Sequence, residues 1–214
     1  MTQRPGCSRR AVLGCLVLFS LTILIGVTTI PFAWRVYYIQ SESMVPTLHP
    51  GDMVIANNWS YLWRKPTRFD IVVFRAPDWA LRPGQAPEKT LFVQRIIGVP
   101  GDVIEIKAGK GVYLNGKLLQ EPYTNGAPEY SMKIVDGLVY EYDDMGGMWK
   151  GGPHMMRVEV LDPEERRRVF ETPTQPIPPG KYLVLGDNRN NSSDSHFWGL
   201  LDESRIIGKV LFRR

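Results

Sequence analysis

The feature that most constrains this chain is a stretch of 24 residues without a charge, from Ala11 to Trp34. As a helix rising about 1.5 Å per residue, it can cross a hydrocarbon core of about 30 Å. Three arginines lie among the first ten residues and only Arg35 follows closely, which predicts a cytoplasmic tail of residues 1–10 and an exported remainder. A cleaved signal peptide is the alternative, but its apolar region usually has only about 7–15 residues. We therefore expect residues 11–34 to form one uncleaved transmembrane helix, with Trp34, Tyr37 and Tyr38 in an interfacial aromatic belt.

Charge and cysteine content exclude several functions for the exported part. The first 34 residues hold three of the 26 basic residues and none of the 22 acidic ones, so residues 35–214 are nearly neutral. No nucleic-acid partner is expected, because a solvated face explains the basic run from Glu165 to Arg168. Both cysteines, Cys7 and Cys15, lie in or before the anchor, which excludes a disulfide or a thiolate nucleophile in the exported part. The histidines His49, His154 and His196 have no close ligand spacing, so neither a metal nor another cofactor is expected.

The exported part reads as mostly β. Short β-branched or alternating runs bounded by Gly, Pro or Asn are typical of strands, and they occur at Asp52–Trp59, Asp70–Pro77, Leu91–Val99, Asp102–Gly109, Gly111–Leu119, Gly180–Asn188 and Arg205–Arg213. Asn115 to Lys117 predicts a tight hairpin turn. Residues from about 121 to 179 are less regular, with a weak strand at 156–161 and a short helical turn at 162–170, and we expect an inserted smaller β subdomain there. The simplest assembly is one domain, residues 35–214, whose first and last strands meet.

Two serines one residue apart follow the anchor, in "SESMVPTL" (Ser41 to Leu48). Pro46 and Pro50 fix turns around them, and on this segment alone the serines could simply cap a turn. Three further segments follow in order: "FDIVVFRAP" (Phe69 to Pro77), "FVQRIIGVPGD" (Phe92 to Asp102) and "GDNRNNSSDSHFWG" (Gly186 to Gly199). Each joins a strand to a turn rich in Gly, Asp or Asn.

With these four motifs in this order, the chain resembles the bacterial type I signal peptidases, membrane-anchored proteases that remove signal peptides from exported proteins. The resemblance runs from the anchor to the C-terminus and implies a signal-peptidase-like β domain. It makes Ser43 the nucleophile and Ser41 the hydroxyl of the oxyanion hole. Residue 42, usually Gly in the family, is Glu42 here.

The family uses a Ser–Lys dyad, in which burial keeps the lysine neutral and able to accept a proton. The dyad lysine directly precedes the arginine of K-R-x-x-G-x-P-G-D, and this chain has Gln94 there, followed by Arg95. A carboxamide can hydrogen-bond the Ser43 hydroxyl but cannot take its proton. The dyad is therefore broken, and deleting a catalytic base costs several orders of magnitude in rate.

Other residues of the motifs are expected to support the site or to replace the base. Lys89 lies about 16 Å from Gln94 along a strand, on the opposite face. His196 is the better substitute by its chemistry, although the resemblance gives it a structural role beside Asp194. Ser192 matches the serine that hydrogen-bonds the dyad lysine. A buried polar network is expected around these two positions, formed by Arg95, Asp187, Asn188, Arg189, Ser192, Asp194 and His196; its carboxylates could also be read as an acid site.

Two functions remain open. The first is a membrane-anchored serine endopeptidase that removes signal peptides from exported precursor proteins after small residues, with the substrate added as an extended strand. The second is an inactive homologue that binds signal sequences or a partner peptidase, which Gln94 favours. An unrelated anchored β domain would not account for the four motifs. In either function the partners are precursor proteins and membrane lipid, in a plasma or thylakoid-type membrane that is crossed once.

Overall fold

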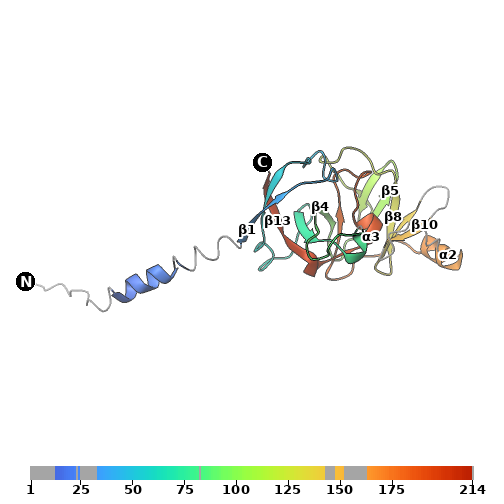
Figure 1. The fold of residues 1–214 in the computed structure, drawn as a ribbon. Helices are drawn as coiled ribbons and strands as arrows, with labels where there is room; N and C mark the ends of the chain where they lie inside the picture. The colour runs from blue at the N-terminus through green and yellow to red at the C-terminus, as the bar shows by residue number, and fades with distance from the viewer. Residues whose placement is uncertain are drawn as a thin grey trace, which may run out of the picture.

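The computed structural model describes residues 13–22, 24, 33–81, 83–142, 148–151 and 163–213. Residues 13–22 are helical, and this segment projects away from the folded body (Figure 1). Among the residues described, no helix reaches the length and apolar character needed to cross a bilayer. The anchor expected over residues 11–34 falls largely outside the described ranges and stays a prediction. Trp34, the last residue of that expected anchor, begins a β-strand instead.

The folded part consists mainly of two antiparallel sheets, as expected for a mostly β chain (Figure 1). The first sheet has seven strands in the order β1-β2-β13-β3-β4-β11-β12. Their bounds are β1 Trp34–Tyr38, β2 Met53–Asn57, β3 Ile71–Arg75, β4 Leu91–Gly98, β11 Lys181–Leu185, β12 Leu201–Asp202 and β13 Ile206–Arg213. The last strand, β13, pairs with β2 and β3. The strands expected first and last, in residues 52–59 and 205–213, therefore meet as expected, although β1 precedes them and, among the described strands, pairs with β2 only.

The second sheet has six strands in the order β10-β9-β8-β5-β6-β7. Their bounds are β5 Ile104–Lys107, β6 Gly111–Leu114, β7 Lys117–Leu118, β8 Ser131–Val135, β9 Leu138–Tyr142 and β10 Met148–Gly151. The β6–β7 hairpin turns at Asn115 and Gly116, both with positive φ, as the sequence predicts. This sheet begins before residue 121 because it includes β5 to β7. The expected subdomain boundary at about 121–179 stays a prediction.

Short helices lie at the margins of the sheets. Helix α2, Pro163–Glu171, confirms the helical turn expected at 162–170 and lies at the far end of the second sheet (Figure 1). The weak strand expected at 156–161 lies outside the described residues. Helix α3, Ser195–Trp198, follows β11 and belongs to the last sequence motif. Two short 3-10 helices, η1 Asp78–Ala80 and η2 Glu203–Arg205, are the remaining elements in the described part of the chain.

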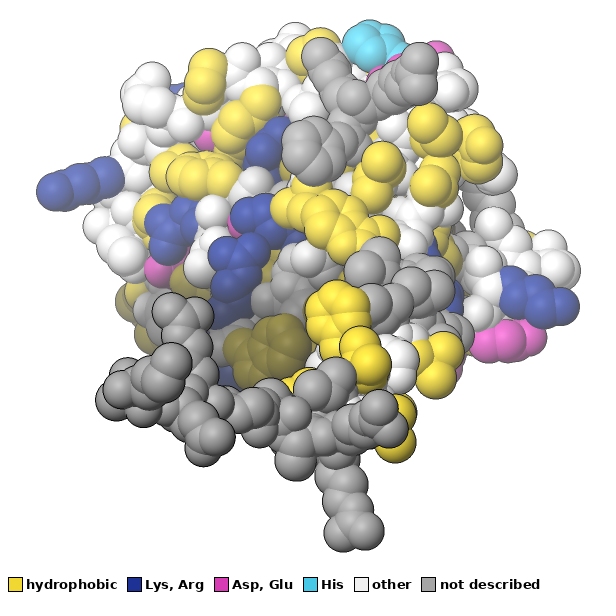
Figure 2. Space-filling view, turned by 90° about the vertical axis from the view of Figure 1, so that its left-hand side faces the viewer, with side chains coloured by type: hydrophobic (Ala, Val, Ile, Leu, Met, Phe, Trp, Pro, Cys, Tyr) yellow, Lys and Arg dark blue, Asp and Glu magenta, His cyan; other side chains and the backbone are white. Residues whose placement is uncertain are grey.

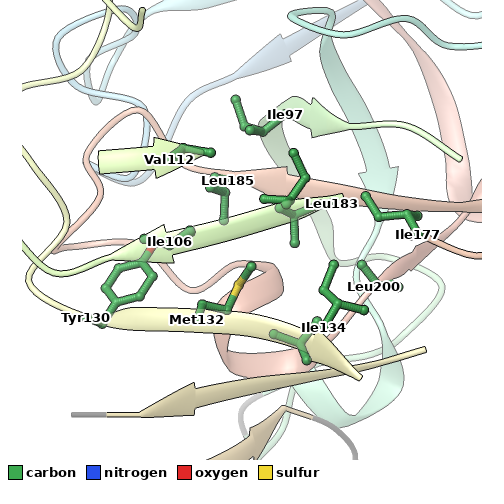
Figure 3. Packing of buried hydrophobic residues seen from close by; sticks show 12 residues of the cluster. Ile97, Ile106, Val112, Tyr130, Met132, Ile134, Ile177, Leu183, Leu185 and Leu200 are labelled. Carbon is green, nitrogen blue, oxygen red and sulfur yellow. The ribbon is translucent and has the colours of Figure 1, made fainter. Parts of the chain in front are cut away.

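The main core lies where the two sheets meet. Apolar side chains from β4, β5, β6, β8 and β11 point toward one another in it (Figure 3), including Ile97, Ile106, Met132 and Leu183, all fully buried. A second cluster on the other face of the first sheet contains Phe74, Ile96 and Trp198. Because the ends of β4 and β11 are held between these two clusters, the polar residues that follow have fixed positions.

Candidate active site

The serine-bearing segment is the loop between β1 and β2. Met44 and Leu48 are about 1% exposed and pack with Ile39 and Val54 in a small apolar cluster. The loop is closed by backbone hydrogen bonds from Ile39 N to Asp52 O and from Gly51 N to Ile39 O, both of 2.9 Å. Buried apolar residues therefore hold the loop that carries the two serines.

Ser41 and Ser43 lie side by side on this loop. Their hydroxyl oxygens are 3.0 Å apart, and either can donate the hydrogen bond. Ser41 is exposed and Ser43 is partly buried. Nucleophile and oxyanion donor were expected at these two residues, and the loop brings the two hydroxyls together.

Gln94 lies on β4 and is 2% exposed. Its Nε2 donates hydrogen bonds to Ser193 O, at 2.8 Å, and to Ser192 Oγ, at 3.3 Å. Its Oε1 is buried and has no hydrogen-bond partner in the part of the chain that the structure describes. The side chain thus occupies a pocket that is polar on the Ser192 side, and it brings no group that titrates near neutral pH.

The next residue, Arg95, belongs to a buried ion pair. Its Nε and Nη2 atoms donate to the two carboxylate oxygens of Asp187 at 2.8 and 2.7 Å. Thr47 Oγ1 donates to the same carboxylate at 2.5 Å, and the ring of Tyr123 lies 4.0 Å from the guanidinium carbon. Because Thr47 belongs to the serine loop, this pair ties that loop to β4 and to the end of β11.

Asn188 and Arg189 connect the end of β11 to the serine loop and to the second sheet. Asn188 N donates to Ser43 O at 3.0 Å, which fixes the backbone of the nucleophile candidate. Arg189 donates to both oxygens of Glu121 at 2.8 and 2.7 Å, and its side chain is 1% exposed. Both residues thus join elements around the serine loop, and Glu121 is a partner that the sequence did not indicate.

Asp194 and His196 form a second buried pair at the start of α3. His196 Nδ1 lies 2.6 Å from Asp194 Oδ1, and Gly186 N donates to Asp194 Oδ2 at 2.9 Å. Complete burial by itself raises the pKa of the Asp194 carboxyl, but the electrostatic interaction with His196 and the hydrogen bonds from His196, Gly186 and Ser192 outweigh it and hold this pKa below its usual range. The carboxylate is therefore ionised near neutral pH.

The proposed substitutes for the base have other contacts. The His196 ring stacks on Tyr130, with centroids 4.2 Å apart, and its Nδ1 is held by Asp194. Lys89 is exposed in the loop before β4, where its backbone N donates to Ala86 O. The hydrogen bond that the structure gives to the Ser43 hydroxyl is with Ser41, not with either of these residues. Among the described residues there is also no group of three side chains that could hold a metal ion.

Gly186 is a site residue that the sequence analysis did not single out. A Cβ at this position would overlap Ser43 O and Ser192 Oγ, and would lie 2.6 Å from Ser192 Cβ. The serine loop and the Ser192 turn therefore pack directly on the backbone at the end of β11. The signal in the sequence is the glycine itself, placed between a buried strand and a polar turn.

Gly186→Ala is expected to lower the free energy of unfolding by about 1–3 kcal/mol, the usual effect of overpacking, and to displace Ser43 from its hydrogen bond with Asn188. Denaturant unfolding measures the first effect. Gly126→Ala is the matched control, because a Cβ there meets no atom within 4 Å. Equal unfolding midpoints for the two variants would contradict this prediction, because they would show that Ser43 and Ser192 can move away from a Cβ at residue 186 at little cost.

Comparison with known proteins relates the chain to signal peptidases over nearly its full length. The family described as signal peptidase, peptidase S26, matches residues 12–214. Signal peptidase I from Leptolyngbya laminosa is 34% identical over 194 residues, covering 91% of this chain and 74% of the relative. Signal peptidase IB from Staphylococcus aureus is 34% identical over 202 residues, covering 94% and 86%. A solved signal peptidase I from Enterococcus faecalis V583 is 27% identical, with a TM-score of 0.38, and covers 70% of this chain and 98% of that one.

Proposed function

Because this chain belongs to the signal peptidase family, peptidase S26, we propose that its serine loop binds the signal peptides of exported precursor proteins and places Ser43 Oγ against the scissile carbonyl. The precursor lies extended beside the loop, with small side chains next to the cleavage site. The Ser43 backbone N–H and the Ser41 hydroxyl donate to the oxyanion that forms when Ser43 attacks. The 3.0 Å separation of the two hydroxyls supports this division of roles.

We also propose that the chain cleaves precursors very slowly. The identity and contacts of residue 94 support this. Gln94 fills the buried position next to Ser192 that we assign to the general base, and it donates both of its described hydrogen bonds as a neutral amide. Ser43 therefore keeps its proton. Its attack on the carbonyl lacks general-base assistance, which typically speeds such a reaction by about 10²–10⁴. The binding groups of a signal peptidase remain, while the proton acceptor does not.

The same observation favours a second role. A chain that binds signal sequences and scarcely cleaves them could hold precursors, or act together with a partner peptidase that does cleave. In both roles the backbone of the serine loop and the turn from Asp187 to Asp194 serve recognition, and the buried ion pairs keep these elements in place. The two roles differ only in whether released signal peptide appears in the presence of this chain alone.

We also propose that the domain works at the surface of a membrane that residues 11–34 cross once, with the N-terminus in the cytoplasm. Figure 2 looks at the side of the domain from which the N-terminal segment leaves, and hydrophobic side chains are interspersed there with Lys and Arg. Trp34 and Tyr38 of β1 are 43% and 70% exposed, and Trp63 in the loop after β2 is 83% exposed. Exposed aromatic rings and basic groups together suit the interface between lipid headgroups and water.

Ser43→Ala is expected to leave precursor binding within about twofold of the unchanged chain, because removing one hydroxyl leaves the oxyanion N–H and the rest of the serine loop in place. The measurement is the dissociation constant of a fluorescent precursor peptide for the full chain in a neutral detergent. Mass spectrometry of the same mixtures reports cleavage. A loss of binding much larger than twofold would assign Ser43 a structural role, and no binding by the unchanged chain would refute the proposed function.

A further inference from the structure

We infer that Glu42 selects among precursors by charge: it favours those whose mature chain begins with Lys or Arg, and disfavours those that begin with Asp or Glu. The inference rests on the proposed function, since it concerns the same serine loop. It adds a specificity determinant that neither serine supplies. The position of Glu42, the lack of a cationic partner for it among the residues that the structure describes, and the chemistry of signal peptides each support it.

Glu42 stands between the two serines but lies apart from their shared hydrogen bond. Its side chain is exposed, and one carboxylate oxygen accepts a hydrogen bond of 3.2 Å from Asn191 Nδ2. Its backbone carbonyl accepts another from Asn188 Nδ2, also at 3.2 Å. Two asparagines of the turn after β11 therefore hold residue 42 at the rim of the site.

No cation among the described residues pairs with the Glu42 carboxylate. Two other carboxylates around the site face a cation, Asp187 with Arg95 and Glu121 with Arg189, and Asp194 lies 2.6 Å from His196 Nδ1. In the described part of the chain, Glu42 has only the neutral Asn191 amide as a side-chain partner. The rim of the site consequently carries one uncompensated negative charge that a bound peptide meets.

The chemistry of signal peptides decides which part of a precursor meets this charge. Residues before the cleavage site are small or apolar, and the basic residues of a signal peptide lie far away at its start. The first residues of the mature chain, in contrast, vary in charge. At about 3.3 Å per extended residue, the first three of them lie within roughly 10 Å of the scissile bond, which is close to the screening length of about 8 Å at physiological ionic strength.

The test uses three peptides that share one signal-peptide end and differ in a single residue, Lys, Ala or Glu, at the second position of the mature part. Dissociation constants are measured by fluorescence anisotropy for the full chain with Ser43→Ala, in neutral detergent and at about 50 mM salt. We expect the Lys peptide to bind about threefold tighter than the Ala peptide, and the Glu peptide about threefold weaker, as is usual for an exposed charge. At about 1 M salt, where the screening length falls to about 3 Å, the difference should disappear.

Adding Glu42→Gln, which keeps an oxygen for Asn191, should make the three affinities equal. Glu171→Gln is the matched control because it removes the same charge from an exposed residue at the end of α2, and it should leave the order unchanged. Equal binding of all three peptides by the chain that keeps Glu42 would overturn the inference and leave the proposed function standing. A preference that survives Glu42→Gln would also overturn it. If none of the peptides binds, the proposed function itself fails.

Discussion

Gln94→Lys is expected to raise the rate of precursor cleavage at least about a hundredfold, the lower range for a positioned general base. The surroundings of residue 94 are already suited to an amine. The side chain is 2% exposed, and Ser192 Oγ and Ser193 O, which accept hydrogen bonds from the Gln94 amide, can accept them from a lysine instead. Burial disfavours the ammonium form, so the lysine should be neutral at a lower pH than an exposed one.

The pH dependence separates a general base from a merely better-packed site. A lysine accepts the Ser43 proton only when it is neutral, so the rate should rise with pH and level off above the pKa of the amine. That pKa should lie below the value of about 10.4 for a free lysine. Gln94→Met is the matched control, because it has a similar volume and no titratable group. It should show neither the rate increase nor the pH dependence.

Rapid cleavage by the unchanged chain would contradict this expectation. The next variant would then be His196→Ala, since histidine is the remaining candidate base of the four motifs. A loss of cleavage with the fold intact would assign the proton transfer to His196. The stacking of His196 on Tyr130 and its contact with Asp194 lead us to expect a stability effect instead.

Much of the first sheet could be predicted from the sequence, because its strands carry local signals. Strands β2, β3, β4 and β11 are short apolar runs between Gly, Pro or Asn residues, and all lie within the predicted ranges. Strand β1 was missed, because Trp34, Tyr37 and Tyr38 also suit a membrane interface. The chemistry of an exposed aromatic residue is the same in an edge strand and in an aromatic belt.

The second sheet was harder to predict for a different reason. Strand β8 is buried on both faces, so "SMKIV" lacks the alternation of polar and apolar residues that marks a half-buried strand. Lys133 at its centre also makes the segment look less like a buried strand. The turn to β9 nevertheless has a sequence signal that was overlooked: Asp136 and Gly137 both have positive φ, as expected for a two-residue hairpin. Local patterns can therefore show the hairpin but not the burial of both faces.

Sequence analysis predicted the site residues that lie in the four motifs, but not most of their contact partners. Ser41, Ser43 and Gln94 were identified from the resemblance, and Asp187 and Asp194 were expected in a buried network. The partners Thr47, Glu121 and Tyr123 were missed, because Thr47 and Asp187 are 140 positions apart and Glu121 and Arg189 are 68 apart. No local periodicity encodes such contacts, which arise only when the sheets assemble.

Asp187→Ala is expected to lower the free energy of unfolding by about 3–5 kcal/mol, because it leaves the Arg95 guanidinium buried without its counter-ion. The side chains of Arg95 and Asp187 are 10% and 0% exposed, and two hydrogen bonds join them. Denaturant unfolding of the full chain in detergent measures the loss. The variant should also weaken precursor binding, because Thr47 loses the acceptor that ties the serine loop to β11.

The double variant Arg95→Met with Asp187→Leu distinguishes the cost of an unpaired charge from the cost of lost packing. It removes both charges and keeps similar volumes, so it should be destabilised much less than Asp187→Ala, and the two single replacements should be strongly non-additive. Tyr123, which packs on the guanidinium at 4.0 Å, can pack on a methionine as well. If Asp187→Ala costs less than about 1 kcal/mol, water reaches Arg95 in solution. The ion pair would then not fix the serine loop, and Asn188 and the close approach at Gly186 would have to hold Ser43 in place.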